Sequence, residues 1–278
     1  MSAVRVTIAN LARRTEPFAC LTCYDATTAR LLSRAGVDVL LVGDTAAEMV
    51  LGYERTLDMP FDVLIALTAG VARGARAAAR EDGVRQPLVM GDMPFMSYHA
   101  GLDAALANAA RFVRASENGG MADIVKLEAD ESFADAIHAM SRAGIAVCAH
   151  IGSRPQRSLL TGNYSAAGRT EAESAALVRD AHALQDAGCV MLLLEAVPDL
   201  AASAVLAAAR VPVIGIGAGS ACHGQVLVLQ DLLGMTDKPP AFVGETANIG
   251  AAIEAAGRDW VERVKARQVV PSPYAMKK

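Results

Sequence analysis

The sequence predicts an α/β fold, specifically a single (β/α)8 TIM barrel, from two observations. Short apolar runs recur along the chain, and each is typical of a strand buried on both faces, as in a parallel sheet. Several of these runs end on an ionisable residue, where a charge is costly unless the strand end opens into a site. In a (β/α)8 barrel the carboxyl ends of all strands meet at one mouth, which accounts for both observations.

Eight strands are expected, and a recurring phrase separates them. The phrase is a helical stretch, then Ala-Gly or Gly-Gly, then an apolar run, as in SRAGVDVLLVGD and DAGCVMLLLEA. Glycine just after a helix adopts the left-handed conformation that ends it, so each phrase marks a helix stopping and a strand starting. The expected strands cover residues 18–24, 38–43, 87–91, 123–128, 145–150, 190–195, 211–216 and 225–230.

We expect one barrel domain over residues 1–278, with a short N-terminal segment, 1–16, and a C-terminal helix and tail, 245–278, the helix itself lying near 246–266. Hydrophobic residues make up 53% of the chain, enough for a large core, and aromatic residues only 4%, as expected for alanine-rich helices around an aliphatic barrel. The net charge of -4 lacks the basic footprint of a nucleic-acid-binding protein. No signal peptide and no apolar run near the roughly 20 residues of a membrane span is found, so we expect a cytoplasmic protein without membrane partners.

The cysteines favour reduced, buried thiols over a zinc or redox centre. There are five, and Cys20 and Cys23 form a C-x-x-C pattern. Positions three apart on a strand point to opposite faces of the sheet, and no second pair lies at zinc-finger spacing. An odd number of cysteines, mostly in expected strands, is typical of a reducing compartment.

Five ionisable residues end expected strands: Asp44, Asp92, Glu128, His150 and Glu195. Each aspartate taken singly could cap a helix or shape a turn. Together, two aspartates at the ends of adjacent strands repel each other and call for a cation between them. Oxygen ligands with open coordination positions suit magnesium better than zinc.

The other candidates carry alternatives of their own. Lys126 and Glu128 share one face of a strand, so they could form a salt bridge with each other. Alternatively, Lys126 could bind an anionic substrate while Glu128 supports the metal shell. His150 alone could be a core histidine. Glu195 follows four apolar residues, 191–194, and apolar surroundings favour the protonated form of a carboxylate and suit it to proton transfer.

Colinear motifs give the chain a resemblance to a known family. They are LTCYDATTARLLSRAGVDVLLVGDT, LGYERTL, MGDMPFMSY, DIVKLE, VCAHIGSRPQ, GRTEAE, LLLEAVP, VPVIGIGAG and GQVLVLQDLLG. Over about residues 17–250 the chain resembles ketopantoate hydroxymethyltransferase (3-methyl-2-oxobutanoate hydroxymethyltransferase). The resemblance implies a barrel of the phosphoenolpyruvate mutase/isocitrate lyase type. It also implies transfer of a hydroxymethyl group from 5,10-methylenetetrahydrofolate to 3-methyl-2-oxobutanoate, giving 2-dehydropantoate in pantothenate biosynthesis through a magnesium-stabilised enolate.

The resemblance also implies roles for single residues and an assembly. The metal ligands would be Asp44 and Asp92, with Glu128 completing or supporting the shell. The substrate-binding residues would be Asp44, Thr45, Asp92, Lys126 and His150, with Thr45 at the substrate carboxylate. Glu195 would accept the proton from C3 of the 2-oxo acid. The assembly would be a homodecamer of two pentameric rings.

The chain departs from the usual family pattern at several places that we expect on mouth loops. These are Ala46-Ala47-Glu48 after Thr45, Asp58-Met59-Pro60, the surroundings of Pro155 and Tyr164, His223 and Gln230. The departures leave two alternatives: a related carbon–carbon bond lyase or hydroxymethyltransferase acting on a different 2-oxo acid, and a non-catalytic paralogue. Retention of all five ionisable strand ends argues against the paralogue, and the segment ADESFADA lacks the catalytic-cysteine loop of an isocitrate lyase.

Three glycines at and just after the end of the seventh expected strand, Gly215, Gly217 and Gly219, have more than one explanation. They could form a tight turn, cradle a phosphate as barrels often do at this point, or leave room for a flat folate ring. The turn is the favoured explanation, and the sequence leaves the other two open.

Overall fold

The computed structural model describes residues 5–115, 119–162, 164–244, 246–274 and 276. Its contacts divide the chain into two compact units, the first ending at Val228 and the second beginning at Leu229. The expected single domain over 1–278 stays a prediction. Residues 1–4 of the expected N-terminal segment, and residues 245, 275 and 277–278 of the expected C-terminal tail, lie outside the described residues.

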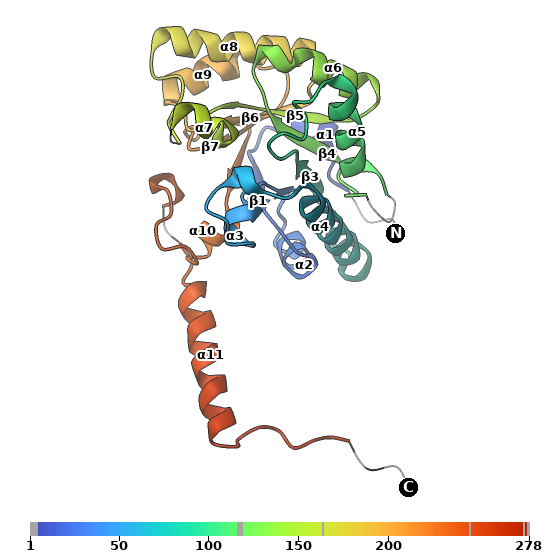
Figure 1. Ribbon diagram of the computed structural model, residues 1–278, viewed down its shortest axis with the longest axis vertical. Helices are drawn as coiled ribbons and strands as arrows, with labels where there is room; N and C mark the ends of the chain where they lie inside the picture. The colour runs from blue at the N-terminus through green and yellow to red at the C-terminus, as the bar shows by residue number, and fades with distance from the viewer. Residues whose placement is uncertain (1–4, 116–118, 163, 245, 275, 277–278) are drawn as a thin grey trace. The chain divides into compact units, whose positions relative to one another are not determined.

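The first unit is a closed barrel of eight parallel strands in sequence order, with β8 pairing back to β1. The strands are β1 (Phe18–Thr22), β2 (Val39–Val42), β3 (Leu88–Asp92), β4 (Ile124–Glu128), β5 (Val147–Gly152), β6 (Met191–Glu195), β7 (Val213–Ile216) and β8 (Gly224–Leu227). Helices pack around the outside of this sheet (Figure 1). The (β/α)8 barrel predicted from the sequence is therefore confirmed.

Each of the eight expected strands is present, and the last differs most in its bounds. It was expected over residues 225–230, whereas β8 covers Gly224–Leu227 and helix α10 (Leu229–Leu232) follows. The reason lies in pairing, because β1 contacts β8 only as far as the pair Leu21 and Leu227. The apolar run continues past that point, but no neighbouring strand accompanies it.

In the described ranges of the chain, six longer helices alternate with the strands, and the ends of these helices follow local sequence signals. They are α2 (Ala26–Arg34), α4 (Phe61–Asp82), α5 (Leu102–Val113), α6 (Ala134–Arg142), α8 (Glu171–Asp186) and α9 (Asp199–Ala208). Asp25 caps α2 by accepting from the backbone N–H of Thr28 at 2.8 Å. Thr170 and Glu173 form a reciprocal capping box at the start of α8. Residues 217–223, between β7 and β8, contain no helix.

Short helical segments lie on the connections. They are α1 (Ile8–Ala12), α3 (Ala46–Met49) and α7 (Ser158–Thr161), and the 3-10 turns η1 (Thr56–Asp58), η2 (Glu131–Phe133) and η3 (Pro155–Arg157). Apart from α1, all of them follow the carboxyl end of a strand. They therefore surround the barrel mouth, where connections carry function in this architecture.

The core has two layers because side chains alternate along each strand. An inner cluster fills the barrel and includes Cys20, Met90 and Cys148. An outer cluster, which includes Cys23, packs the strands against the helices. Cys20 and Cys23 therefore point to opposite sides of the sheet, and all five cysteines are free and buried, as the sequence predicted.

His223 lies at the opposite end of the barrel from the mouth, so its expected place on a mouth loop is wrong. It directly precedes β8, its carbonyl accepts from the N–H of Phe18 at 3.0 Å, and its Nδ1 accepts from the N–H of Val213 at 3.1 Å. Phe18 and Val213 begin β1 and β7. A loop without a helix connects β7 to β8, and at His223 this loop has already reached the amino ends of the strands.

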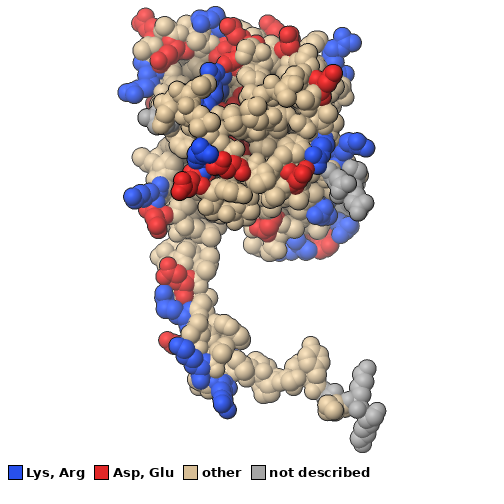
Figure 2. Space-filling model, in the orientation of Figure 1, with Lys and Arg blue, Asp and Glu red and all other residues tan. Residues whose placement is uncertain are grey.

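The second unit contains α10, the 3-10 turn η4 (Ala241–Val243) and α11 (Ile249–Lys265), close to the helix expected near 246–266. Gly234 ends the first of these segments with φ of 64°, and a Cβ there would lie 2.1 Å from the carbonyl oxygen of Ala247. None of the helices in the described part of the chain is long and apolar enough to cross a membrane. On the visible face of the barrel unit, acidic and basic side chains are interspersed (Figure 2).

Candidate active site

Five ionisable side chains expected at strand ends meet at the mouth of the barrel. Asp92, Glu128 and Glu195 are the last residues of β3, β4 and β6, Asp44 follows β2 by two residues, and His150 lies within β5. All but Glu195 are buried. Because neighbouring parallel strands end at the same edge, residues up to 151 positions apart in the chain share one small volume.

Asp44, Asp92 and Lys126 form the densest part of this cluster. The Oδ2 atom of Asp92 accepts from the backbone N–H of Asp44 at 3.1 Å and from Nζ of Lys126 at 2.7 Å. The structure thus pairs Lys126 with Asp92, rather than with Glu128 two residues along its own strand. The second oxygen of Asp92, Oδ1, is buried and has no hydrogen-bond partner among the residues that the structure describes.

Gln156, which is not among the residues predicted from the sequence, connects the carboxylates. Its Nε2 donates to Oδ2 of Asp44 at 2.9 Å and to the carbonyl of Met93 at 3.1 Å, and its backbone N–H lies 3.1 Å from both oxygens of Glu128. Its Oε1 accepts from the hydroxyl of Tyr98 at 2.7 Å. Tyr98 and Gln156 lie within two motifs of the family resemblance, MGDMPFMSY and VCAHIGSRPQ. A neutral side chain on a loop does not carry the high cost of burying a charge, so nothing in the sequence marks Gln156 as a site residue.

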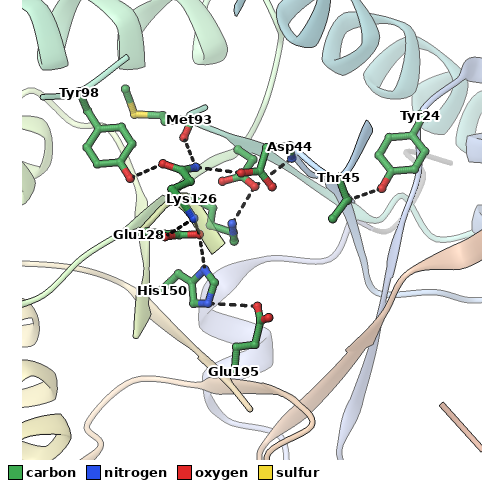
Figure 3. Close-up of polar contacts among 11 residues, drawn as sticks. Tyr24, Asp44, Thr45, Met93, Tyr98, Lys126, Glu128, His150 and Glu195 are labelled. Carbon is green, nitrogen blue, oxygen red and sulfur yellow. Dashed lines mark hydrogen bonds and ion pairs between the residues drawn. The ribbon is translucent and has the colours of Figure 1, made fainter. Parts of the chain in front are cut away.

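His150 lies between two carboxylates. Its Nε2 is 3.3 Å from Oε2 of Glu195, and its Nδ1 is 3.9 Å from Oε1 of Glu128. The side chains of His150 and Glu195 point toward each other (Figure 3). Burial lowers the pKa of His150, and the nearby Glu195 opposes that shift. A neutral imidazole therefore separates Glu195 from the other carboxylates.

Thr45 stands at the opposite side of the cluster. Its hydroxyl lies 2.6 Å from the hydroxyl of Tyr24, a residue that follows β1 (Figure 3). Burial raises the pKa of Tyr24 above its ordinary value. The pair presents two neutral hydroxyl groups beside Asp44, which is the chemistry needed to hold a carboxylate without adding charge.

The cluster holds more carboxyl groups than cationic groups. Burial acts to lower the pKa of Lys126, but the carboxylates of Asp92, Asp44 and Glu128 together raise it above its ordinary value, so the ammonium stays charged. Burial also raises the pKa of Asp92, against the opposing effect of Lys126, and the pKa of Glu128, to which the charge of Asp44 adds. One ammonium thus faces three carboxyl groups in a buried volume. The raised pKa values of Asp92 and Glu128 favour their neutral forms there, and an additional cation would stabilise the ionised forms.

The donor set fits a divalent cation held by two carboxylates. No three His, Cys, Asp or Glu side chains converge as a metal cage within the described residues. The backbone N–H of Asp44 contacts Asp92, however, and Asp92 keeps a buried oxygen that has no partner in the described part of the chain. Magnesium is commonly bound by one or two carboxylates, with water and substrate in its other positions. Both oxygens of Glu128 already accept from Gln156, and its place as a third ligand stays a prediction.

The departures from the family pattern have structural partners. Ala46 and Ala47 are buried in α3, and Met59 is buried after η1. Asp58 forms a two-bond ion pair with Arg55, at 2.8 and 3.0 Å, so its charge is compensated locally. Glu48 is near enough to Tyr164 to raise the pKa of that phenol, together with burial, which is the larger cause.

The glycine run after β7 adopts turn conformations. Gly217 and Gly219 have φ of 58° and 74°, which side chains rarely adopt. A Cβ on Gly219 would also lie 2.2 Å from Oδ1 of Asp199. These values support the tight turn that the sequence favoured, and they do not require a bound phosphate.

The fold and the cluster together define a class: a (β/α)8-barrel enzyme with an acidic, lysine-containing centre at its mouth, suited to a small anionic substrate. The sequence model of the family described as ketopantoate hydroxymethyltransferase matches residues 4–272. The 3-methyl-2-oxobutanoate hydroxymethyltransferase of Anaeromyxobacter sp. (strain Fw109-5) is 44% identical over 272 residues, covering 96% of this chain and 86% of that protein. The protein of the same name from Pyrobaculum islandicum is 40% identical over 261 residues, covering 94% and 95%. The chain belongs to the ketopantoate hydroxymethyltransferase family.

Solved structures extend the likeness of fold to a wider superfamily. One is 2,3-dimethylmalate lyase, a member of the PEP mutase/isocitrate lyase superfamily, with a TM-score of 0.57 and 18% identity over 94% of this chain and 88% of that one. Phosphonopyruvate hydrolase in complex with oxalate and Mg++ has a TM-score of 0.56 and 12% identity, covering 92% and 87%. At these identities the likeness concerns the fold alone.

Proposed function

We propose that this enzyme transfers a hydroxymethyl group from 5,10-methylenetetrahydrofolate to 3-methyl-2-oxobutanoate, giving 2-dehydropantoate. Family membership and the names of the relatives support the reaction. The observation that carries the proposal is the division of the mouth into two sides. One side holds the Asp92–Lys126 pair, 2.7 Å apart, and the other holds Glu195, 3.3 Å from the buried His150.

The reaction needs a base and a means of stabilising negative charge. Glu195 takes the proton from C3, and the electron pair of that C–H bond moves toward the keto oxygen. The C3 carbon then bonds to the methylene carbon of the donor, and water supplies the hydroxyl group. Tetrahydrofolate leaves with both of its nitrogens again bearing hydrogen, one from C3 and one from water, so the atoms balance.

Lys126, as a charged ammonium, and His150, as a neutral imidazole, assist this reaction in different ways. The ammonium of Lys126 compensates charge that develops on the substrate oxygens, in a buried volume where such compensation is strong. His150, kept neutral by burial, contacts the 2-oxo acid and holds the carboxylate of Glu195 in place. Asp44 and Asp92 would hold magnesium, with Glu128 in support. Magnesium there would supply positive charge that stabilises the developing enolate, by several kcal/mol on the usual scale.

The test is an assay of 3-methyl-2-oxobutanoate with the folate donor, with and without magnesium, scored for 2-dehydropantoate. Exchange of the C3 proton for deuterium, followed by NMR without folate, tests the base step separately. We expect turnover and exchange with magnesium, and loss of both after chelation. If neither occurs, while a different 2-oxo diacid is cleaved without folate, the chain is a carbon–carbon bond lyase instead.

The resemblance to the family further supports a homodecamer in the cytoplasm as part of this proposal. Light scattering on the purified protein would then give a mass ten times the 28.9 kDa of one chain. A mass near that of a single chain would contradict the decamer without affecting the proposed reaction.

A further inference from the structure

A cavity of about 300 Å³ opens directly beside the carboxylate cluster. Glu128 and Gln156 line it, and these residues also bond with each other and, through Gln156, with Asp44. The cavity therefore shares a wall with the proposed catalytic centre. Its volume lies at the lower end of the range for small-molecule sites, enough for a ring system rather than for a large ligand.

One wall of the cavity is aromatic. Tyr98 and His99, which follow β3, have ring centroids 4.2 Å apart, and the ring of Phe133 in η2 lies 5.5 Å from each of them. Phe95 extends the wall, with its ring 5.6 Å from that of His99. Rings gathered at these distances offer both faces and edges to a flat ligand.

The remaining boundary is basic and apolar. Arg154 and Arg157 both contact Oδ2 of Asp130, at 2.6 and 3.1 Å, so two guanidinium groups share one oxygen of this carboxylate. The side chain of Arg157 is 45% exposed at the cavity and can turn toward an anion. Leu159 and Leu160 of α7 also line the cavity and are exposed.

We propose that this cavity binds the pterin ring of the one-carbon donor against the aromatic wall, while the rest of the donor extends outward and its glutamate carboxylates meet the partly exposed Arg157. The inference rests on the proposed function and assigns a place to its second substrate. The chemistry matches on three counts. A flat ring meets the aromatic wall, and an anionic tail meets the partly exposed guanidinium of Arg157. The shared wall at Glu128 brings the donor next to the 2-oxo acid.

The first test is a charge reversal, Arg157→Glu, measured by calorimetry with tetrahydrofolate and by the KM for 5,10-methylenetetrahydrofolate. We expect at least a tenfold loss in both, because an attractive contact becomes repulsive. A tetrahydropterin without the glutamate tail should bind both proteins equally. Arg73→Glu, an exposed reversal on α4 away from the cavity, is the matched control and should leave the KM values and turnover unchanged.

The second test addresses the aromatic wall. Phe133→Leu keeps an apolar side chain but removes the ring, and should weaken tetrahydrofolate binding by about two- to tenfold, the usual range for ring–ring contacts. Phe133→Tyr keeps the ring and should restore the affinity. The two variants together separate a stacking contact from a simple change in volume.

Exchange of the C3 proton, measured without folate, distinguishes this proposal from the proposed function. Exchange should continue in Arg157→Glu and Phe133→Leu, since neither side chain touches Glu195, Lys126 or His150. Unchanged affinity for tetrahydrofolate in both variants, with normal wild-type turnover, overturns the cavity assignment alone. Absence of exchange and turnover in the wild-type enzyme overturns the proposed function instead.

Discussion

At the scale of single residues, Glu195 differs from the other ionisable groups at the barrel mouth in its access to solvent. Its side chain is 26% exposed, whereas Asp44, Asp92, Glu128 and His150 are buried. A base that takes a proton from carbon and later releases it needs such access. The buried groups, by contrast, keep their positions and charges through contacts with one another.

Glu195→Gln should therefore abolish the base while leaving the rest of the mouth intact. We expect exchange of the C3 proton to fall by about 100- to 10,000-fold, the usual contribution of a general base. Binding of 3-methyl-2-oxobutanoate, measured by calorimetry, should persist. Glu171→Gln, in the exposed first turn of α8, serves as the control. Normal exchange in Glu195→Gln would remove this residue as the base.

Gln156 is the residue on which the arrangement of the carboxylates most depends. It is only 3% exposed, and its side-chain amide bonds with Asp44, Met93 and Tyr98. The carboxylates could be predicted from the sequence, because a charged residue at the end of a buried strand is costly unless that end forms a site. Gln156 could not be predicted in this way, because it is a neutral amide on the connection between a strand and a helix. Its hydrogen-bond partners are also far away in the chain, so no local pattern indicates them.

Gln156→Ala should lower the free energy of unfolding by about 1–3 kcal/mol, because it leaves buried acceptors without a donor. Gln156→Glu should lower it further, since a carboxylate would then face Asp44. Both variants keep the backbone N–H that binds Glu128. Urea denaturation in the presence of a chelator measures the difference. Stability equal to wild type in both variants would show that the bonds seen here contribute nothing.

At the scale of elements, the strands were predictable and the connections were not. An apolar run of four to six residues identifies a buried strand wherever it lies, so β1 to β7 fall close to their expected bounds. The end of β8 and the place of His223 depend on which strands lie alongside, information that a local pattern does not contain. The conformation of residues after a strand depends on the same long-range contacts.

Gly152, the last residue of β5, illustrates such a long-range requirement. It has φ of 97°, and a Cβ there would lie 2.4 Å from the carbonyl oxygen of Glu195 and 3.0 Å from its nitrogen. Both atoms belong to backbone, which cannot turn away as a side chain can. The residue after Glu195, Ala196, also has a positive φ, 49°, so the chain is bent where the base is presented.

Gly152→Ala should displace Glu195 and reduce C3 exchange by about 100-fold, the scale expected for a misplacement of about 1 Å. The matched control is Gly144→Ala, which has φ of 81° but no neighbouring atom within 4 Å of the added Cβ. In the control the added methyl group causes backbone strain alone, which should lower the free energy of unfolding by about 1–2 kcal/mol. The rate of C3 proton exchange should stay unchanged. Equal exchange in the two variants would contradict the contact with Glu195.

At the scale of the whole molecule, the cysteines report on the integrity of the barrel. They lie on two strands and three connections of the first unit, and all are buried. Burial raises the pKa of Cys23 and of Cys189 to about 12, and raises those of Cys20, Cys148 and Cys222 above the ordinary value. The thiolate is the reactive form of cysteine. Each thiol is therefore protected in two ways: it is buried away from the reagent, and it stays protonated.

A thiol reagent such as Ellman's reagent at pH 8 should therefore react with almost none of the five thiols in the folded protein and with all five in denaturant. The rate should follow global unfolding, because no local opening of one loop exposes both the inner face of β1 at Cys20 and the outer side at Cys23. A fast-reacting thiol in the folded protein would contradict the burial. Fewer than five in denaturant would reveal a disulfide and contradict the assignment of free thiols.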